Sequence, residues 1–305
     1  MIEMLRSPTS ERNSVPDSTG PDGLLVIDKP PGMTSHDVVD HVRKKLHTKK
    51  VGHGGTLDPD ATGVLVVGVG KATRLLAYSQ SAPKSYHGTA LFGVTTSTQD
   101  ASGDVLQERD VSTTRGDLEA VLAEFVGDIS QIPPMVSAVK VDGERLYRKA
   151  RRGEEVERAA RPVHVYSLTL ESWTDGPRPQ ATFDVECSGG TYIRTLVNDI
   201  GARLGCGAHL THLRRTASGG FTLEDAIALD DVSIEKMRPL VDVVGDMRRV
   251  EVDEEAAASV SHGRRLEVVD DTADDEVVAV TRGARLLAVY RRRGDALVAE
   301  RVVAT

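Results

Sequence analysis

The segment Gly52–Gly63 has the composition of a shaped loop with a carboxylate near its centre. Four glycines and one proline occur in these twelve residues, and Asp58 lies among them. Glycine accepts backbone conformations that other residues resist and lets the main chain come close to a ligand. We therefore expect Asp58 to carry the chemistry of this protein, with a purely structural turn as the alternative.

Two other interpretations of this loop fail on residue spacing. A calcium loop that began at Asp58 would need a glutamate where Val69 stands. A nucleotide-phosphate loop would need a glycine at Leu65 and a hydroxyl group at Ala72. We therefore expect neither calcium nor ATP here.

The rest of the sequence gives little support for a nucleophilic serine or cysteine or for a zinc site. There is no G-x-S-x-G motif, and the two cysteines lie in no reactive motif. Cys206, His209 and His212 have a spacing that could hold zinc only with a fourth ligand from afar. We expect them to be core or polar-contact residues and predict no metal site.

A second glycine turn, Gly189-Gly190, precedes Tyr192 and Arg194. An aromatic ring and a guanidinium group can stack a nucleic-acid base and pair with a carboxylate or phosphate. A buried aromatic ring beside a surface arginine is the alternative interpretation.

The net charge of −8 is a local property of the chain. Ten acidic residues and two arginines lie between Glu251 and Glu276, so the remaining chain is neutral overall. Basic residues gather in three clusters, at Arg43–Lys50, Lys140–Arg161 and Arg291–Arg293. One such cluster is usually only a solvated surface, but three in a neutral body favour a polyanionic partner.

The sequence also indicates the compartment. No run approaches the roughly 18 apolar residues that cross a bilayer, and the first 23 residues lack the apolar core of a signal peptide. Two cysteines are too few for a disulfide framework. We expect a cytoplasmic protein with no membrane partner.

Hydrophobic periodicity predicts strands and helices that mix without a βαβ rhythm, which favours an α+β fold. A capping box at Thr34 and Asp37 predicts a helix that carries the first basic cluster. Further helices are expected near Asp117–Phe125 and Thr195–Leu204. Strands are expected at Leu24–Ile27, Val64–Val69, Ser85–Phe92, Val163–Leu170, Ala181–Val185, Val277–Thr281, Leu286–Tyr290 and Leu297–Val303.

Composition divides the chain into three parts. Residues 1–22, rich in polar residues and proline, are expected to be a disordered leader. Residues 23–245 are expected to form the catalytic domain. Residues 246–305 are expected to form a small β-rich domain that is marginally stable without its neighbour.

Six ordered segments together resemble the TruB family of tRNA pseudouridine synthases, from Leu24 nearly to the C-terminus. They are Asp28–Ser35, the Asp58 loop, Lys84–Tyr86, Ile132–Lys140, Gly190–Arg194 and Ala208–Arg215. The resemblance implies a catalytic domain with a mixed, largely antiparallel sheet and a C-terminal PUA-like RNA-binding domain. It also implies isomerisation of uridine 55 in the T loop of tRNA, by base flipping and without cofactor or metal.

The resemblance also implies roles for individual residues. Asp58 resembles the family's catalytic aspartate, which acts at C1′, C6 or C2′; the sequence leaves these routes open. Arg194 resembles the arginine that pairs with it and keeps it ionised. Tyr86 resembles the ring that stacks on the target base and is a candidate for moving the C5 proton.

Further residues are implied to hold the substrate. Tyr192 and Leu213 resemble base-pocket residues, and His53 resembles the histidine that fills the vacated stack. Lys29 and Pro30 are expected to support the site structurally.

Two alternatives remain open. A pseudouridine synthase of the same superfamily could act on another RNA, including by guide RNA. A non-catalytic RNA-binding or tRNA-folding protein is the other alternative. We expect a monomer that binds the T-arm stem-loop.

Overall fold

The computed structural model describes residues 20–303, except 138, 142, 147–148, 150–151, 246 and 269–271. Most of the expected leader, residues 1–22, lies outside this part of the chain. Asp22 is described, and its carboxylate accepts a hydrogen bond from the backbone N–H of Lys71 at 2.6 Å. The fold therefore includes Asp22, one residue before the expected start.

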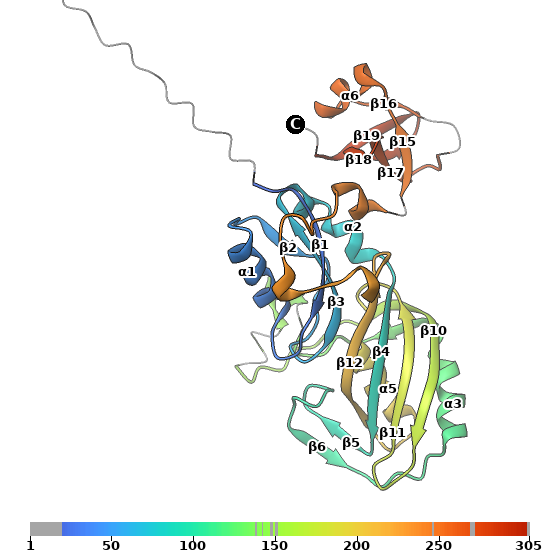
Figure 1. The fold of residues 1–305 in the computed structure, drawn as a ribbon. Helices are drawn as coiled ribbons and strands as arrows, with labels where there is room; N and C mark the ends of the chain where they lie inside the picture. The colour runs from blue at the N-terminus through green and yellow to red at the C-terminus, as the bar shows by residue number, and fades with distance from the viewer. Residues whose placement is uncertain are drawn as a thin grey trace, which may run out of the picture.

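A ten-stranded sheet forms the body of the molecule (Figure 1). Its strand order is β14-β1-β3-β12-β4-β11-β10-β7, with β2 beside β3 and β13 beside β12. Only β1–β14 and β3–β12 pair in parallel in this sheet, as the structure describes it. The expected α+β fold with a mixed, largely antiparallel sheet is confirmed. The strands are β1 (Gly23–Lys29), β2 (Val51–His53), β3 (Thr62–Val69), β4 (Lys84–Phe92), β7 (Gly127–Gln131), β10 (Arg161–Thr174), β11 (Gln180–Cys187), β12 (Ala208–Ser218), β13 (Phe221–Thr222) and β14 (Ile227–Ala228).

Helices cover this sheet at two places. The helices beside the large sheet are α1 (Ser35–Lys45), α2 (Leu76–Ser81), α3 (Arg115–Glu124) and α5 (Ile193–Arg203). The expected capping box at Thr34 and Asp37 starts α1. Helix α1 packs beside β1 to β3, whereas α3 and α5 pack on the half that contains β4 and β10 to β12.

Strand β1 is buried on both faces. Leu25 and Ile27 pack with the valines of α1, while Leu24 and Val26 pack in a second apolar cluster with Leu76 of α2. The second cluster also includes residues of the C-terminal sheet. The two parts of the chain therefore share this apolar cluster, in addition to clusters of their own.

Strand β12 joins the two halves of the large sheet, because it pairs with β3 on one side and β4 on the other. Its hydrophobic pattern did not predict a strand. Two register shifts against β4, between Leu210 and His212 and between Arg215 and Ala217, interrupt the alternation of inward and outward side chains. The strand brings Leu213 and Arg215 to the middle of the sheet.

The C-terminal module has five strands in the order β15-β17-β18-β19-β16, with helix α6 (Glu254–Ser261) against them. The three strands expected there are confirmed as β17, β18 and β19. The division at residue 246, which lies outside the described residues, stays a prediction. The strands are β15 (Arg248–Glu251), β16 (Leu266–Glu267), β17 (Val277–Arg282), β18 (Arg285–Arg293) and β19 (Ala296–Val302).

Ion pairs within this module involve two residues of its acidic segment, Glu254 and Asp275. Asp275 pairs with Arg291 and Arg293, and Glu254 pairs with Arg282. The third basic cluster is thus largely neutralised by the module's own carboxylates. It is a weaker polyanion site than the sequence indicates.

Shorter elements complete the fold. Two small antiparallel pairs are β5 (Val94–Thr96) with β6 (Val105–Glu108), and β8 (Lys140–Val141) with β9 (Glu144–Arg145). Four 3-10 helices span Gly70–Arg74, Leu223–Asp225, Leu229–Asp231 and Leu240–Val244 in the described chain. No helix of the described residues is long and apolar enough to cross a membrane.

A substitution at Gly63 tests how closely the backbones of β3 and β12 approach each other. Gly63 has φ +98°, and a Cβ atom there would lie 2.2 Å from the carbonyl oxygen of Arg215. We expect Gly63→Ala to lower stability by about 3 kcal/mol or more, because backbone strain and a backbone clash combine. Gly32→Ala is the control, since Gly32 has φ +79° in open space and should lose only about 1–2 kcal/mol. If thermal denaturation showed equal losses of stability for Gly63→Ala and Gly32→Ala, the predicted clash at Gly63 would be contradicted.

Candidate active site

A cleft of about 590 Å³ opens between the Asp58 loop, the Gly189–Tyr192 turn and helix α2. It brings together six residues that the sequence analysis assigned to the site, although they come from β2, β4, β12, α5 and two loops. The six are His53, Asp58, Tyr86, Tyr192, Arg194 and Leu213. Lys29 and Pro30 lie outside the lining, next to the loop.

Lys29 binds the Asp58 loop through hydrogen bonds to its backbone. Its buried ammonium group donates hydrogen bonds to the carbonyl oxygens of Pro30, Pro59 and Ala61 at 2.9, 2.8 and 2.7 Å. Burial lowers the pKa of Lys29 to about 8, although neighbouring aspartates oppose the shift. Lys29 therefore fixes the backbone that follows Asp58 and ties it to Pro30.

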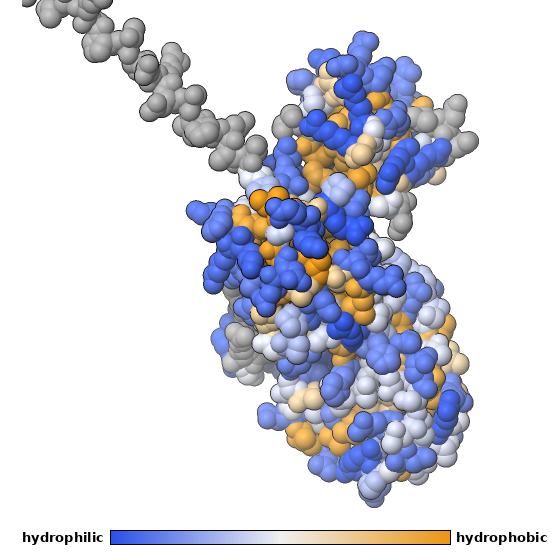
Figure 2. Space-filling view, in the orientation of Figure 1, coloured by the Kyte–Doolittle hydropathy of each residue, from blue (hydrophilic) through white to orange (hydrophobic). Residues whose placement is uncertain are grey.

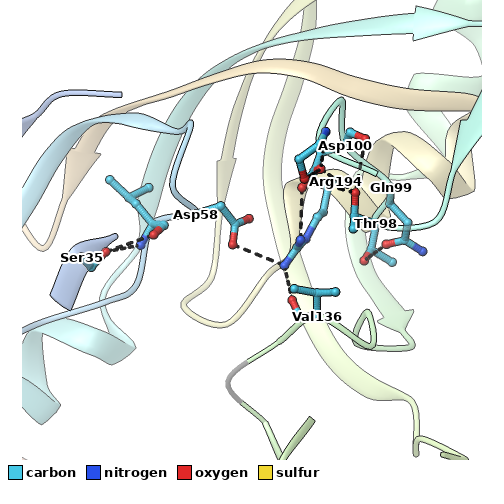
Figure 3. Close-up of polar contacts among 10 residues, drawn as sticks. Ser35, Asp58, Thr98, Gln99, Asp100, Val136 and Arg194 are labelled. Carbon is cyan, nitrogen blue, oxygen red and sulfur yellow. Dashed lines mark hydrogen bonds and ion pairs between the residues drawn. The ribbon is translucent and has the colours of Figure 1, made fainter. Parts of the chain in front are cut away.

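Ser35, the first residue of α1, fixes the residue before Asp58. Its hydroxyl oxygen accepts a hydrogen bond from the N–H of Leu57 at 2.8 Å and donates one to the Leu57 carbonyl at 3.1 Å (Figure 3). Ser35 is 1% exposed. The start of α1 thus positions the loop, a role that the helix-capping pattern did not reveal.

Arg194 connects three separate parts of the site (Figure 3). It lies in the first turn of α5 and is only 4% exposed. Its guanidinium nitrogens lie 3.4 Å from Asp58 Oδ1 and 3.2 Å from Asp100 Oδ2, and one donates to the Val136 carbonyl at 2.6 Å. The pairing of Arg194 with a carboxylate, one of the two interpretations of its motif, matches this geometry.

Asp100 is a second carboxylate that the sequence analysis missed. Its Oδ1 accepts hydrogen bonds from the Thr98 hydroxyl and from the backbone and hydroxyl of Ser102. Burial would raise the pKa of Asp100, but these bonds and Arg194 lower it below the usual value. The Asp-x-Ser spacing is a turn signal, but nothing in it connects this turn to Arg194.

Asp58 itself is less strongly held. Its side chain is 43% exposed and lies within the cleft, with protein on the other sides. This burial raises the pKa of Asp58, the charge of Arg194 opposes the rise, and the charge of Asp100 adds to it. Asp58 is thus a carboxylate of raised basicity that pairs with Arg194 and also feels the charge of Lys29.

Tyr86 lines the cleft and contacts a second buried arginine. It is 7% exposed, and its position in β4 pairs with Arg215 of β12. Burial raises the pKa of the Tyr86 hydroxyl, which a hydrogen bond and the charge of Arg215 oppose. Arg215 also donates to the carbonyls of Val64 and Gly55 at 2.7 and 3.2 Å. The sequence analysis quoted Arg215 only as part of a motif.

Tyr192, Leu213 and His53 complete the lining. Tyr192 is the N-cap of α5, and both its backbone N–H and its carbonyl bond to the side chain of Gln131, at 3.0 and 3.3 Å. His53 ends β2, and its Nδ1 accepts a bond from the N–H of Gly55 at 3.4 Å. His53 also lines a neighbouring groove, so it stands at the border of two hollows.

Cys206, His209 and His212 make other contacts. The Cys206 sulfur accepts a hydrogen bond from Thr113, and His209 Nδ1 lies 2.9 Å from the Val94 carbonyl. Within the described ranges, no group of three or more His, Cys, Asp or Glu residues is arranged to hold a metal ion.

Comparison with protein families shows where the chain belongs. Residues 43–193 match the N-terminal domain of the TruB family of pseudouridylate synthases, and residues 194–240 match the C-terminal domain of tRNA pseudouridylate synthase B. A relative from Symbiobacterium thermophilum named tRNA pseudouridine synthase B is 53% identical, over 79% of this chain and 82% of its own length. The relative of the same name from Streptococcus pneumoniae serotype 2 is 44% identical, over 90% of this chain and 96% of its own length.

The chain belongs to the TruB family. The family match covers both walls of the cleft, since Asp58 and Tyr86 lie in the first matched segment and Arg194 and Leu213 in the second. As a member of the TruB family the protein is an isomerase of the pseudouridine synthase type.

Solved structures agree with the TruB fold. A chain of a Cbf5-Nop10-Gar1 complex superposes with a TM-score of 0.72 at 30% identity, over 92% of this chain and 84% of its own. A chain of an H/ACA RNP bound to a substrate RNA containing 2′-deoxyuridine superposes with a TM-score of 0.71 at 28% identity. The superposition covers 93% of this chain and 85% of the other.

Asp100 gives a test of the electrostatics. We expect Asp100→Asn to lower the pKa of Asp58, because removing a neighbouring negative charge favours the ionised carboxylate and leaves Arg194 to Asp58. The measurement is a carbon-13 NMR titration of the Asp58 carboxyl group. Asp60→Asn is the control, since Asp60 acts in the same direction but more weakly. An unchanged or higher pKa in Asp100→Asn would disprove this coupling.

Proposed function

We propose that this enzyme converts uridine 55 in the T loop of tRNA to pseudouridine. The observation that carries the proposal is Asp58, paired with buried Arg194 in a cleft that Tyr86 also lines. The relatives named tRNA pseudouridine synthase B, at up to 53% identity, support tRNA as the substrate.

The reaction needs an ionised carboxylate. The bond between uracil N1 and ribose C1′ breaks, and C5 joins C1′; N1 gains a proton and C5 loses one, so no oxidant is required. Asp58 would act by attack on C1′, by attack on C6, or by removing the C2′ proton. Each route begins from the charged form of Asp58.

Arg194 would keep Asp58 charged when substrate fills the cleft. A bound base expels water, which strengthens both the burial penalty and the attraction of the guanidinium group. Because Arg194 is fixed by Asp100 and the Val136 carbonyl, it would also direct the Asp58 oxygen that it contacts.

Tyr86, Tyr192 and Leu213 would hold the flipped base. Base–aromatic stacking contributes about 1–3 kcal/mol, which offsets part of the cost of unstacking uridine. Since burial raises the pKa of Tyr86, its hydroxyl is protonated at neutral pH. A role in moving the C5 proton would thus start from the neutral phenol. His53, at the rim, would fill the vacated stack.

A basic groove next to the cleft would bind the RNA backbone. It shares His53, Ala77 and Gln80 with the cleft and is lined by Lys49, Lys50 and other residues. Both lysines are exposed and form no ion pair among the described residues. Such cations would contact T-arm phosphates and release counterions.

The wider assignments follow from this function. We also propose a monomeric enzyme that acts in the cytoplasm, the compartment expected for a tRNA substrate. Residues 23–245 would form the catalytic domain and 246–305 a PUA-like RNA-binding domain, after a leader of residues 1–22. Lys29 and Pro30 would support the site through the loop contacts.

A second function is an isomerase that acts on another RNA. The similarity to a chain of an H/ACA RNP favours this possibility. The greater identity to relatives named for tRNA favours the first function. Activity without any guide RNA or protein partner separates the two.

The direct test is pseudouridine mapping in an unmodified T-arm stem-loop. We expect wild-type enzyme alone to modify position 55, and Asp58→Asn to bind the RNA with similar affinity but convert less than about 1% as fast, since an amide keeps the shape and loses the charge. Product from Asp58→Asn at a rate near wild type would refute the role of Asp58. Binding without product by the wild type would favour a non-catalytic RNA-binding protein.

Salt dependence tests the groove. We expect Lys49→Gln/Lys50→Gln to weaken binding and to make the slope of log affinity against log salt shallower by about 1.5, as expected for two lost phosphate contacts. Arg115→Gln is the control, because Arg115 lies on α3 and pairs with Glu119. Binding curves with the same slope for wild type and the double variant would exclude this groove.

A further inference from the structure

Helix α2 lies between the C-terminal module and the candidate active site. Ala77, Gln80 and Ser81 line the cleft, whereas Tyr78 contacts the module. Figure 2 shows apolar surface on both parts of the chain near the place where the module meets the body. A six-residue helix therefore forms part of two interfaces at once.

The module contacts α2 through a specific polar bond. The Tyr78 hydroxyl donates a hydrogen bond to Glu300 Oε2 at 2.9 Å, and Arg291 Nε donates to Glu300 Oε1 at 2.5 Å. Arg291 is held in turn by Asp275. The Tyr78 ring packs on the apolar cluster that both parts of the chain share. The acceptor of Tyr78 is thus fixed within the module, not free on its surface.

The other side of α2 packs on the glycines that begin the catalytic loop. A Cβ atom at Gly54 would lie 3.1 Å from the Ser79 hydroxyl, and one at Gly52 would lie 3.4 Å from Leu76. Gly54 lies four residues before Asp58. A shift of α2 therefore displaces the start of the Asp58 loop.

The end of α2 also packs on the turn that precedes Arg194. A Cβ atom at Gly189 would lie 2.2 Å from the carbonyl oxygen of Gln80. The same carbonyl accepts a hydrogen bond at 2.8 Å from buried Lys84, two residues before Tyr86. Helix α2 therefore touches the segments that carry all three proposed catalytic residues.

We propose that Tyr78 is a positioning residue for the isomerisation, and that its bond to Glu300 makes the C-terminal module part of the catalytic apparatus. The proposal rests on the proposed function and extends it. When this hydrogen bond is removed, the ring of Tyr78 still packs on the apolar cluster. Helix α2 can then shift against Gly54 and Gly189. The loss falls on the chemical step, since none of the substituted atoms lies in the cleft.

The experiment compares single-turnover rates and RNA affinities of full-length variants on the T-arm stem-loop. Tyr78→Phe removes only the hydroxyl group, and Glu300→Gln removes the charge of its acceptor. Tyr290→Phe is the matched control, because its hydroxyl donates at 2.8 Å to the Arg264 carbonyl inside the module. Thermal denaturation of each variant reports the stability.

We expect Tyr78→Phe to lower the single-turnover rate by about threefold to tenfold with unchanged affinity. This is less than the full contribution of a hydrogen bond to a charged group, because the ring of Tyr78 keeps α2 packed. Glu300→Gln should act in the same way, and the double variant should be no slower than the slower single variant. Tyr290→Phe should keep the wild-type rate at a similar loss of stability.

A wild-type rate in both Tyr78→Phe and Glu300→Gln would overturn the proposal, and so would an equal loss of rate in Tyr290→Phe. If Tyr78→Phe does not fold, Glu300→Gln alone decides by the same criteria. Failure of the proposed function is distinguishable, because wild-type enzyme would then form no pseudouridine.

Discussion

The buried guanidinium group of Arg194 is the interaction on which the site depends. It holds Asp58 by one long contact, while Asp100 and the Val136 carbonyl fix its own position. An arginine with two carboxylates stays charged although it is buried. Asp100 accepts hydrogen bonds from its own turn and keeps a lowered pKa, whereas Asp58 keeps a raised one. Asp100 is thus a structural partner of Arg194, and Asp58 is the carboxylate that we propose to be reactive.

The fold brings the parts of this interaction together from distant segments. Strand β12 joins two half-sheets, Lys29 and Ser35 fix the loop, and α5 begins at the cleft. Glycines are required where these elements meet, most clearly at Gly63, whose position leaves no room for a side chain. Charges are also arranged locally. Glu254 and Asp275 of the acidic segment pair with arginines of the same module, whereas Lys49 and Lys50 are exposed beside the cleft.

The sequence predicted most elements because their hydrophobic periods are regular, as in α1 with its capping box and in β17 to β19. It did not predict β12, where two register shifts break the alternation. The residues brought to the cleft were proposed from motifs and resemblance, not from contacts. Asp100 and Ser35 were missed because their partners, Arg194 and Leu57, lie 94 and 22 residues away. Local patterns carry no information on such contacts.

The central claim is that Arg194 both keeps Asp58 ionised and directs it at the substrate. The most direct measurement is the single-turnover rate of Arg194→Gln on the T-arm stem-loop as a function of pH. We expect a loss of about hundredfold or more, and the acidic limb of the profile should move to higher pH, because the neutral amide no longer lowers the pKa of Asp58. A profile with the wild-type rate and the wild-type acidic limb would contradict the account.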